Sequence, residues 1–375
     1  MSRPLTVVQL LPALEAGGVE RGTLEIARAL VADGHRSVVI SAGGRLVEPL
    51  VAGGSEHIEL DIGRKSIASL WLVPKLRRRF VELGADIVHA RSRLPAWLTL
   101  LAWRGMDRAT RPRFVTTMHG LNSVNLYSSV MARGERVICV SQTVREHILK
   151  HYPKTDPARL RVIPRAVDPV EFPHGHRPDG DWRKRFVAEH PGLSGPAPWL
   201  CLAGRGTRMK GQGHAIRLVA DLRESGVETR LILLGVREPG REHYVDELRS
   251  QAQRQGVADA VVMTSPRRDV RDVMAASALV LQLSPKPEAF GRTVVEALNL
   301  GVPVLGFDLA GAGEQLRDLF PQGAVVVGDR NALAQRARAL ISGGERPAAF
   351  DRYRLQQMQA ATLAVYRELQ EAPRR

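Results

Sequence analysis

Cysteine and long apolar runs are scarce in this 375-residue sequence, and each shortage excludes a class of protein. The two cysteines, Cys139 and Cys201, lie in separate apolar stretches without metal-ligand spacing, which excludes a disulfide framework and indicates buried thiols in a reducing compartment. No segment approaches the ~18–20 apolar residues that span a bilayer, and the first residues lack the layout of a signal peptide. We therefore expect a cytoplasmic protein.

Acidic residues are fewer than basic ones, with 39 Asp and Glu against 54 Lys and Arg and a net charge of +15. This excess favours anionic partners, which include nucleic acid, an anionic bilayer and a phosphorylated substrate. A solvated arginine-rich surface would account for it as well. Because aromatic residues make up only 5% of the chain and no nucleic-acid-binding motif is present, we expect no nucleic acid as a partner.

Strand-like runs alternate with helical patterns in both halves of the chain, which predicts βαβ units and parallel sheets. The expected strands are residues 6–11, 37–42, 57–62, 86–91, 113–119, 136–141 and 161–164, then 198–204, 230–235, 260–265, 279–284, 302–308 and 324–328. The predicted fold is α/β, with two doubly wound Rossmann-like domains that face each other across a cleft. They span residues 1–170 and 198–346, with a linker at 171–197 and a last helix from about Pro347 to Glu371.

The stretch 283–306 places two carboxylates, Glu288 and Glu296, around a turn between a predicted strand and a predicted helix that begins at Arg292. Such a turn lies at the carboxyl edge of a parallel sheet, where open α/β folds bind ligands. The helix start offers backbone N–H groups to a phosphate, and carboxylates accept hydrogen bonds from sugar hydroxyls. The combination predicts a nucleotide-sugar site.

Two glycine-containing loops follow strands and precede helices. In residues 204–211 (GRGTRMKG), Arg205 and Lys210 are placed to neutralise a diphosphate leaving group, although the loop does not have the Walker A spacing. A solvated basic loop is the alternative. In the first half, Gly17 and Gly18 allow a ligand to approach the backbone, or form a tight turn without one.

His119 ends a predicted strand and would project from the sheet edge, although a lone histidine is more often structural. Asp179-Gly180-Asp181 is formally a metal-binding D-x-D, but its place in the linker favours a helix N-cap. We expect no metal and no cofactor, because Arg205, Lys210 and helix dipoles supply positive charge for the diphosphate.

Residues 70–80 and 94–104 combine tryptophan, leucine and arginine. They predict either an interfacial surface that lies on anionic lipid, which would make the protein peripheral on the inner face of the cytoplasmic membrane, or core helices with only the arginine tips in water.

Taken together, the motifs resemble the retaining GT-B-fold glycosyltransferases of family 4, of the lipopolysaccharide-core type. The resemblance spans nearly the whole chain. In the first half it rests on the Gly17-Gly18 loop, DIVHA at 86–90, His119, and VICVSQTV before RVIPRAVDPVEF. In the second half it rests on GRGTRMKG, LLG at 233–235, SPKPEAFGRTVVEALNLGVPV at 284–304, and Glu314 in AGAGEQL.

The resemblance implies a role for each matching residue. It implies that Glu288, with Ala289 beside it, contacts the hydroxyls of the transferred sugar, and that Glu296 binds the nucleotide ribose. The amides of Phe290, Gly291, Arg292 and Thr293 would meet the phosphate, Arg205 and Lys210 would hold the diphosphate, and His119 would lie near the anomeric centre. Gly17 and Gly18 complete the donor-binding set. One departure is Pro164-Arg165-Ala166, where the family commonly has Pro-Asn-Gly, so that Arg165 adds a cation.

The expected reaction is transfer of a hexose from a UDP-glucose-like donor to a hydroxyl of a lipopolysaccharide core or another anionic glycolipid, with retained configuration. A nucleotide-sugar epimerase of the same fold is the alternative enzyme, and a basic nucleic-acid-binding protein is the alternative of a different class.

Overall fold

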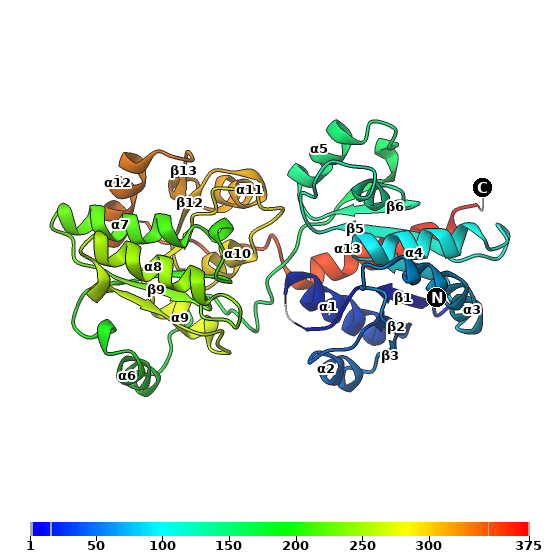
Figure 1. The fold of residues 1–375 in the computed structure, drawn as a ribbon, viewed down its shortest axis with the longest axis horizontal. Helices are drawn as coiled ribbons and strands as arrows, with labels where there is room; N and C mark the ends of the chain where they lie inside the picture. The colour runs from blue at the N-terminus through cyan, green and yellow to red at the C-terminus, as the bar shows by residue number, and fades with distance from the viewer. Residues whose placement is uncertain (1–2, 16, 344, 374–375) are drawn as a thin grey trace. The chain divides into compact units, whose positions relative to one another are not determined.

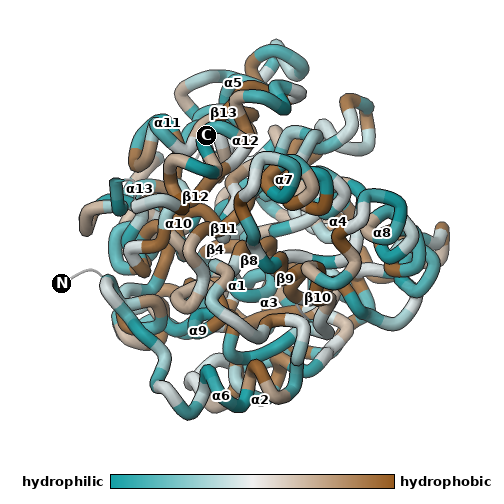
Figure 2. Tube along the Cα trace, turned by 90° about the vertical axis from the view of Figure 1, so that its left-hand side faces the viewer, coloured by the Kyte–Doolittle hydropathy of each residue, from teal (hydrophilic) through white to brown (hydrophobic). Residues whose placement is uncertain are grey.

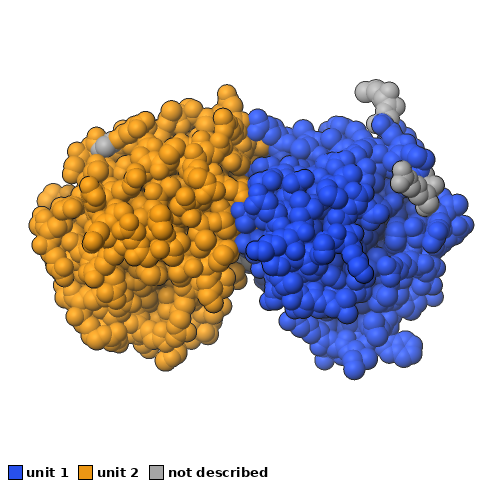
Figure 3. Space-filling model, turned by 90° about the horizontal axis from the view of Figure 1, so that it is seen from above, with its two compact units in different colours: residues 1–165, 355–375 blue, residues 166–354 orange. Residues whose placement is uncertain are grey.

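Two parallel sheets carry the fold, one in each half of the chain (Figure 1). A computed structural model describes residues 3–15, 17–343 and 345–373. The chain divides into unit 1, which comprises residues 1–165 and 355–375, and unit 2, residues 166–354 (Figure 3). Within the described residues, no helix is both long and apolar enough to cross a membrane.

Unit 1 holds a sheet of seven parallel strands in the order β3-β2-β1-β4-β5-β6-β7 within the described residues. The strands are β1 Thr6–Leu10, β2 Arg36–Ser41, β3 Glu56–Glu59, β4 Ile87–Ala90, β5 Arg113–Met118, β6 Arg136–Cys139 and β7 Leu160–Val162. The helices between them are α1 Gly18–Ala32, α2 Val47–Ala52, η1 Ile67–Trp71, α3 Leu72–Glu82, α4 Arg93–Arg104, η2 Ser128–Ala132, α5 Gln142–His151 and η3 Pro157–Arg159. The central strands are buried from end to end because helices cover both faces of a parallel sheet.

Unit 2 holds a sheet of six parallel strands in the order β10-β9-β8-β11-β12-β13, again within the described residues. The strands are β8 Trp199–Ala203, β9 Arg230–Leu234, β10 Val261–Met263, β11 Leu279–Gln282, β12 Val304–Phe307 and β13 Ala324–Val325. The helices are α6 Gly180–Glu189, η4 Pro191–Leu193, η5 Arg208–Lys210, α7 Gln212–Glu224, α8 Glu242–Arg254, η6 Ala258–Ala260, α9 Val270–Ala276, α10 Arg292–Asn299, α11 Ala310–Leu319, η7 Pro321–Gly323 and α12 Arg330–Ile341. Hydrophobic residues gather on the strands, and the outer turns of helices such as α8 are hydrophilic (Figure 2).

The last helix, α13 (Leu355–Glu371), returns to unit 1 and packs with Leu363, Tyr366 and Leu369 into the core of that unit. The expected start at Pro347 is wrong by eight positions. Residues 345–350 form no regular structure, and Tyr353 has a left-handed backbone with φ 56°, which a continuous helix does not allow.

The segment expected to be a linker, residues 171–197, is part of unit 2. Its helix α6 packs through Phe186, which stacks with Trp182 at 5.0 Å between ring centroids and lies 5.8 Å from Trp199. Asp179 caps this helix by accepting a hydrogen bond from the backbone N–H of Trp182, as expected for the Asp179-Gly180-Asp181 segment.

Candidate functional site

The loops after β8 and β11 leave the same edge of the unit 2 sheet side by side. The two strands are parallel neighbours, with Leu200 opposite Leu279 and Cys201 opposite Val280. The basic loop 204–211 follows β8, and the loop 283–291 with its acidic residue follows β11. Because parallel strands end at one edge, the fold brings together two motifs that are 72 residues apart or more in the sequence.

Lys210 and Glu288 form the contact between these loops. The Lys210 Nζ donates to Glu288 Oε1 at 2.9 Å, with side-chain exposures of 31% and 15%. The aliphatic stem of Lys210 passes over Gly204, where a Cβ atom would lie 3.4 Å from its Cγ and Cδ. Gly211 has φ 77°, and a Cβ there would lie 1.8 Å from the carbonyl oxygen of Leu283, so this position requires glycine.

Buried polar side chains hold the basic loop in place. Gln212 is fully buried, its Nε2 donates to the carbonyl oxygen of Arg205 at 2.9 Å, and its Oε1 accepts from the Tyr244 hydroxyl at 3.2 Å. The guanidinium of Arg205 is exposed and makes no hydrogen bond or ion pair with the part of the chain that the structure describes. A fixed backbone therefore carries a cation that is available to a ligand.

The turn before α10 is held from the opposite side by α11. The N–H of Gly311 donates to the carbonyl oxygen of Glu288 at 2.9 Å, and Gln315 Nε2 donates to that of Phe290 at 2.5 Å. A Cβ on Gly311 would lie 2.2 Å from the carbonyl oxygen of Ala289, so the two segments touch through their backbones. Gly291, with φ 86°, then starts the helix, and its carbonyl oxygen accepts from the N–H of Val294 at 3.0 Å.

The two glutamates of this stretch differ in exposure. Glu288 lines a narrow recess, too small to hold a water molecule, together with Gln282, Ser284, Lys286, Phe307, Leu309 and Ala312. Glu296 is only 6% exposed, and its Oε1 lies 3.5 Å from the Nε of Arg292, one helical turn earlier. Glu288 is thus the more exposed of the two, whereas the carboxylate of Glu296 is buried beside Arg292.

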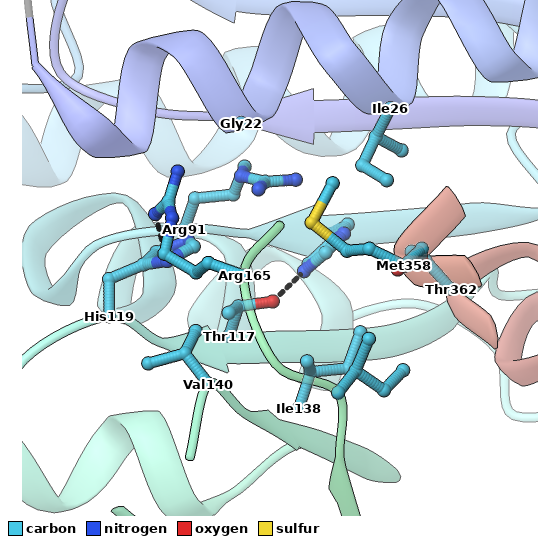
Figure 4. Close-up of a pocket in the computed structure, with 12 residues that line it drawn as sticks. Gly22, Ile26, Arg91, Thr117, His119, Ile138, Val140, Arg165, Met358 and Thr362 are labelled. Carbon is cyan, nitrogen blue, oxygen red and sulfur yellow. Dashed lines mark hydrogen bonds between the residues drawn. The ribbon is translucent and has the colours of Figure 1, made fainter. Parts of the chain in front are cut away.

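A second group of polar side chains surrounds His119 in unit 1 (Figure 4). His119 follows β5 and Arg91 follows its neighbour β4, and both line a cavity of about 20 Å³, the space of roughly one water molecule. Burial, and then the charges of Arg91 and Arg165, hold the pKa of His119 well below its usual range. The imidazole is therefore neutral at pH 7.

The tautomer of His119 follows from its neighbour Arg165. The Arg165 Nη1 lies 3.1 Å from His119 Nδ1, and a guanidinium can only donate, so Nδ1 accepts and the proton is on Nε2 (Figure 4). The Nε2 is buried and has no hydrogen-bond partner among the described residues. His119 therefore presents one unused N–H donor.

Arg165 also connects His119 to the start of α1. It is 7% exposed, and its Nη2 donates to the carbonyl oxygen of Gly18. A Cβ on Gly18 would lie 3.7 Å from the Arg165 guanidinium carbon, and Gly17 has φ 144° at the helix N-cap. Arg165, the residue that departs from the pattern of the resembled family, therefore contacts both His119 and the predicted Gly17-Gly18 loop.

Arg91 is a site residue that the sequence interpretation missed. Its Nη1 donates to Gln9 Oε1 at 2.7 Å, it is 5% exposed, and burial lowers its pKa. Its place directly after a buried strand was the available signal, the same one that singled out His119. By contrast, His89 lies between the Tyr366 hydroxyl at 2.7 Å and the Thr117 hydroxyl at 2.6 Å, which is a structural arrangement.

The stretch 94–104 is a core helix rather than a membrane surface. In α4, Leu98, Leu100 and Ala102 are at most 2% exposed. The indole N–H groups of Trp97 and Trp103 donate to backbone carbonyl oxygens at 2.8 and 2.7 Å, so neither ring is free to leave the protein. For this stretch the structure supports the alternative of a core helix, because its apolar face packs inward.

Two family models match the chain, one in each half. Glycosyltransferase Family 4 matches residues 16–171, and Glycosyl transferases group 1 matches residues 186–357. A crystal structure of a glycosyltransferase from Rickettsia africae ESF-5 has a TM-score of 0.85 at 24% identity and covers 99% of this chain and 100% of that one. The protein is a glycosyltransferase of the GT-B type.

Relatives of this glycosyltransferase carry different acceptor names. The D-inositol 3-phosphate glycosyltransferase of Actinosynnema mirum is 27% identical over 87% of this chain and 80% of its own length. The lipopolysaccharide glucosyltransferase WaaG of Escherichia coli is 28% identical, over 45% of this chain and 42% of its own. Anabaena Alr3699/HepE, solved in complex with UDP and glucose, shares the fold with a TM-score of 0.76 at 20% identity, covering 97% of this chain and 100% of that one.

The predicted site residues of this glycosyltransferase fall into two groups. Unit 2 brings together Arg205, Lys210, Glu288 and the turn Ala289–Thr293, with Glu296 buried next to Arg292. Unit 1 brings together His119 and the Gly17-Gly18 loop through Arg165. The first group has the cations, amides and carboxylate that a sugar diphosphate needs, and the second has a neutral hydrogen-bond donor.

Proposed function

We propose that this glycosyltransferase moves a hexose from a UDP-glucose-like donor to a hydroxyl of a lipopolysaccharide core or another anionic glycolipid, with retained configuration. The observation that carries the donor half is the Lys210–Glu288 pair beside the start of α10. It joins a cation, a carboxylate and the amino-terminal end of a helix at one sheet edge, which are the groups that a diphosphate and a sugar require.

The donor diphosphate would lie on the first-turn amides of α10, with Arg205 and Lys210 as its cations. These groups stabilise the charge that grows on the leaving diphosphate, and they are fixed in advance by Gln212 and Gln315. Glu288 would accept hydrogen bonds from the sugar hydroxyls. Because this chain supplies its own cations, we expect transfer that needs no metal ion.

Retention would follow from departure and attack on the same face of the sugar. The bond between the anomeric carbon and the diphosphate oxygen breaks, the acceptor oxygen bonds to that carbon, and the acceptor proton moves to the departing diphosphate. A double displacement would need a carboxylate at the anomeric carbon. Glu288 is a poor candidate for it, because its carboxylate already pairs with Lys210.

His119 would act as a neutral donor in this reaction. Its Nε2–H is unused, and burial together with the charges of Arg91 and Arg165 disfavours the imidazolium, so the group donates a hydrogen bond without adding charge. The resemblance implies that this donor meets the sugar near the anomeric carbon.

The acceptor half rests on charge and on relatives. A net charge of +15 suits a phosphorylated or otherwise anionic acceptor. The two relatives compared above are named for an inositol phosphate and for lipopolysaccharide, and both acceptors are anionic polyols. An anionic glycolipid would also make the protein work at a membrane surface.

The first experiment is a thermal-shift screen of nucleotide diphosphate sugars, followed by transfer assays on truncated lipopolysaccharide acceptors. We expect Glu288→Gln to lower the turnover roughly hundredfold or more at unchanged melting temperature, because it removes a charge that contacts the sugar. Glu224→Gln, an exposed change at the end of α7, is the matched control. EDTA should leave the rate unchanged.

Two results would contradict the proposal. Near wild-type turnover of Glu288→Gln would overturn the site assignment. Conversion of the donor to an epimer without any acceptor would identify the alternative enzyme, an epimerase.

A further inference from the structure

A short segment of unit 1 exposes three large apolar side chains to solvent. In η1, Ile67 is 88% exposed, Leu70 55% and Trp71 79%. We call these three residues the η1 surface. Scattered apolar residues on a protein surface need no explanation, but a contiguous group that includes a largely exposed tryptophan marks an interaction site.

Local hydrogen bonds fix the conformation in which the η1 surface is exposed to solvent. Ser66 caps η1 by accepting from the N–H of Ala68. The hydroxyl of Ser69, a buried residue, donates to the carbonyl oxygen of Arg64 at 2.5 Å. The serine therefore lies inside and the apolar side chains outside, which is the reverse of an ordinary soluble surface. The following helix, α3, anchors the segment because Leu76 is fully buried and Phe80 is 1% exposed.

Basic residues flank η1 along the sequence. From residue 64 to residue 79 the sequence, RKSIASLWLVPKLRRR, contains six basic residues and no acidic one. Arg79 pairs with Glu82 at 2.9 Å, and Arg77 contacts the carbonyl oxygen of Ala102. The remaining four are exposed and form no ion pair with the described residues: Arg64, Lys65, Lys75 and Arg78.

We infer that the η1 surface docks onto an anionic bilayer. Trp71 and Ile67 would enter the boundary between headgroups and acyl chains, where an indole ring is favoured because it is apolar with one polar N–H. The four free cations would meet lipid phosphates, and each contributes to attraction by an anionic leaflet. The charge decides the occupant: a second copy of the chain docking through this surface would bring like charges together.

The test is vesicle binding by the whole protein, without donor or acceptor, so that its outcome is independent of the proposed glycosyl transfer. The vesicles are phosphatidylcholine alone, or phosphatidylcholine with about one third phosphatidylglycerol, an anionic lipid. We expect binding to the anionic vesicles that weakens with salt, and a blue shift of the tryptophan fluorescence as Trp71 leaves water.

Matched variants distinguish binding through the η1 surface from nonspecific binding of the protein to vesicles. The double variant Ile67→Ser/Trp71→Ser should bind at least roughly tenfold more weakly and lose the blue shift, since both apolar anchors are gone. Lys65→Gln/Arg78→Gln should weaken binding and reduce its salt dependence. The control is Val326→Ser/Val327→Ser, which removes exposed apolar side chains of unit 2 and should bind like the wild type.

Three outcomes would overturn the inference. One is equal binding of the Ile67→Ser/Trp71→Ser variant, provided that its melting temperature matches the wild type. Another is equal affinity for charged and uncharged vesicles. The third is a wild-type dimer that Trp71→Ser dissociates, in the absence of vesicle binding, which would make the η1 surface an interface between copies.

Discussion

Arg165 occupies a position where the resembled family commonly has asparagine, and its guanidinium contacts both His119 and the carbonyl oxygen of Gly18. One side chain thereby fixes the tautomer of a histidine and the start of a helix. A buried cation next to a histidine also disfavours protonation of the ring. The sequence alone predicted an added cation here, but its two contacts depend on how β7 and the loop after β5 lie beside α1.

The role of Arg165 can be tested without substrate. In Arg165→Met we expect the pKa of His119 to rise, because a nearby positive charge is lost, yet to stay below the usual value because the ring remains buried. Arg165→Lys keeps the charge and should keep the pKa low. Histidine NMR titration measures both, and the exposed change Arg104→Met is the control. An unchanged pKa in Arg165→Met would contradict this electrostatic account.

The same variants separate charge from geometry in turnover. Lysine cannot donate to His119 and Gly18 in the forked geometry of a guanidinium. We therefore expect roughly ten- to hundredfold lower turnover for Arg165→Lys as well as for Arg165→Met, since small displacements of a positioned donor have large effects.

Other residues show what sequence patterns do and do not reveal. Arg292 and Glu296 are four apart on a helix, so their proximity follows from helical geometry. The burial of Glu296 does not follow from helical geometry, because it depends on how α10 packs against the rest of unit 2. Lys210 and Glu288 could be assigned to one sheet edge, but their direct pairing depends on β8 and β11 being neighbours, which the chain order does not give.

At the scale of elements, the strands were predicted well because buried parallel strands form short apolar runs between turns. The helices were predicted less well where their ends or buried faces depend on tertiary contacts. The apolar periodicity of α4 could not predict that the tryptophans of this helix donate hydrogen bonds to backbone carbonyl oxygens inside unit 1. The start of α13 was missed because residues 345–354 continue unit 2 before the helix begins.

The packing of α13 gives a prediction about stability. Leu363 is 6% exposed and belongs to the same cluster as Leu5, Ile26 and Ile138. Leu363→Ala should lower the free energy of unfolding by about 2–5 kcal/mol, the cost of a large-to-small change in a core. Gln356→Ala, at an exposed position of the same helix, should have little effect. Urea denaturation of both variants is the measurement, and equal stabilities would contradict the packing of Leu363 in this core.

Ion pairs add to the same attachment. The Glu368 carboxylate accepts from Arg136 and Arg161, both at 2.6 Å, and the hydrogen bond from Arg136 contributes most to lowering its pKa. The pairs join a carboxy-terminal helix to β6 and β7, so α13 closes the unit from which the chain departed at residue 165. Sequence separation of more than 200 residues hides such pairs from local patterns.

For the molecule as a whole, the fold class and the alternation of two parallel α/β units followed from sequence, since both are carried by repeated local patterns. The positions at which the chain passes from one unit to the other did not follow from the sequence. Residues 166–197 lack strong apolar periodicity, yet they belong to unit 2 through α6 and its aromatic contacts. A segment with polar composition can therefore be an integral part of a domain when one buried ring anchors it.

The buried histidines predict how the stability of the molecule depends on pH. His89 and His119 have folded-state pKa values well below the usual 6.5, chiefly because of burial, so the folded protein keeps both rings neutral. Below about pH 6.5 the unfolded chain takes up protons that the folded chain does not, and stability falls as pH decreases, by up to about 1.4 kcal/mol per pH unit for each histidine.

The pH dependence can be assigned to one residue. In His119→Asn, urea denaturation between about pH 7.5 and 5.5 should show a slope of stability against pH that is smaller than the wild-type slope, with a difference that approaches one proton at the acid end of this range. The control His243→Asn, at a position whose side chain is 90% exposed, should keep the wild-type slope. An unchanged slope in His119→Asn would mean that His119 takes up a proton in the folded protein as readily as in the unfolded chain. It could then no longer be a neutral donor, because Arg165 would face an imidazolium instead of donating to the lone pair on Nδ1.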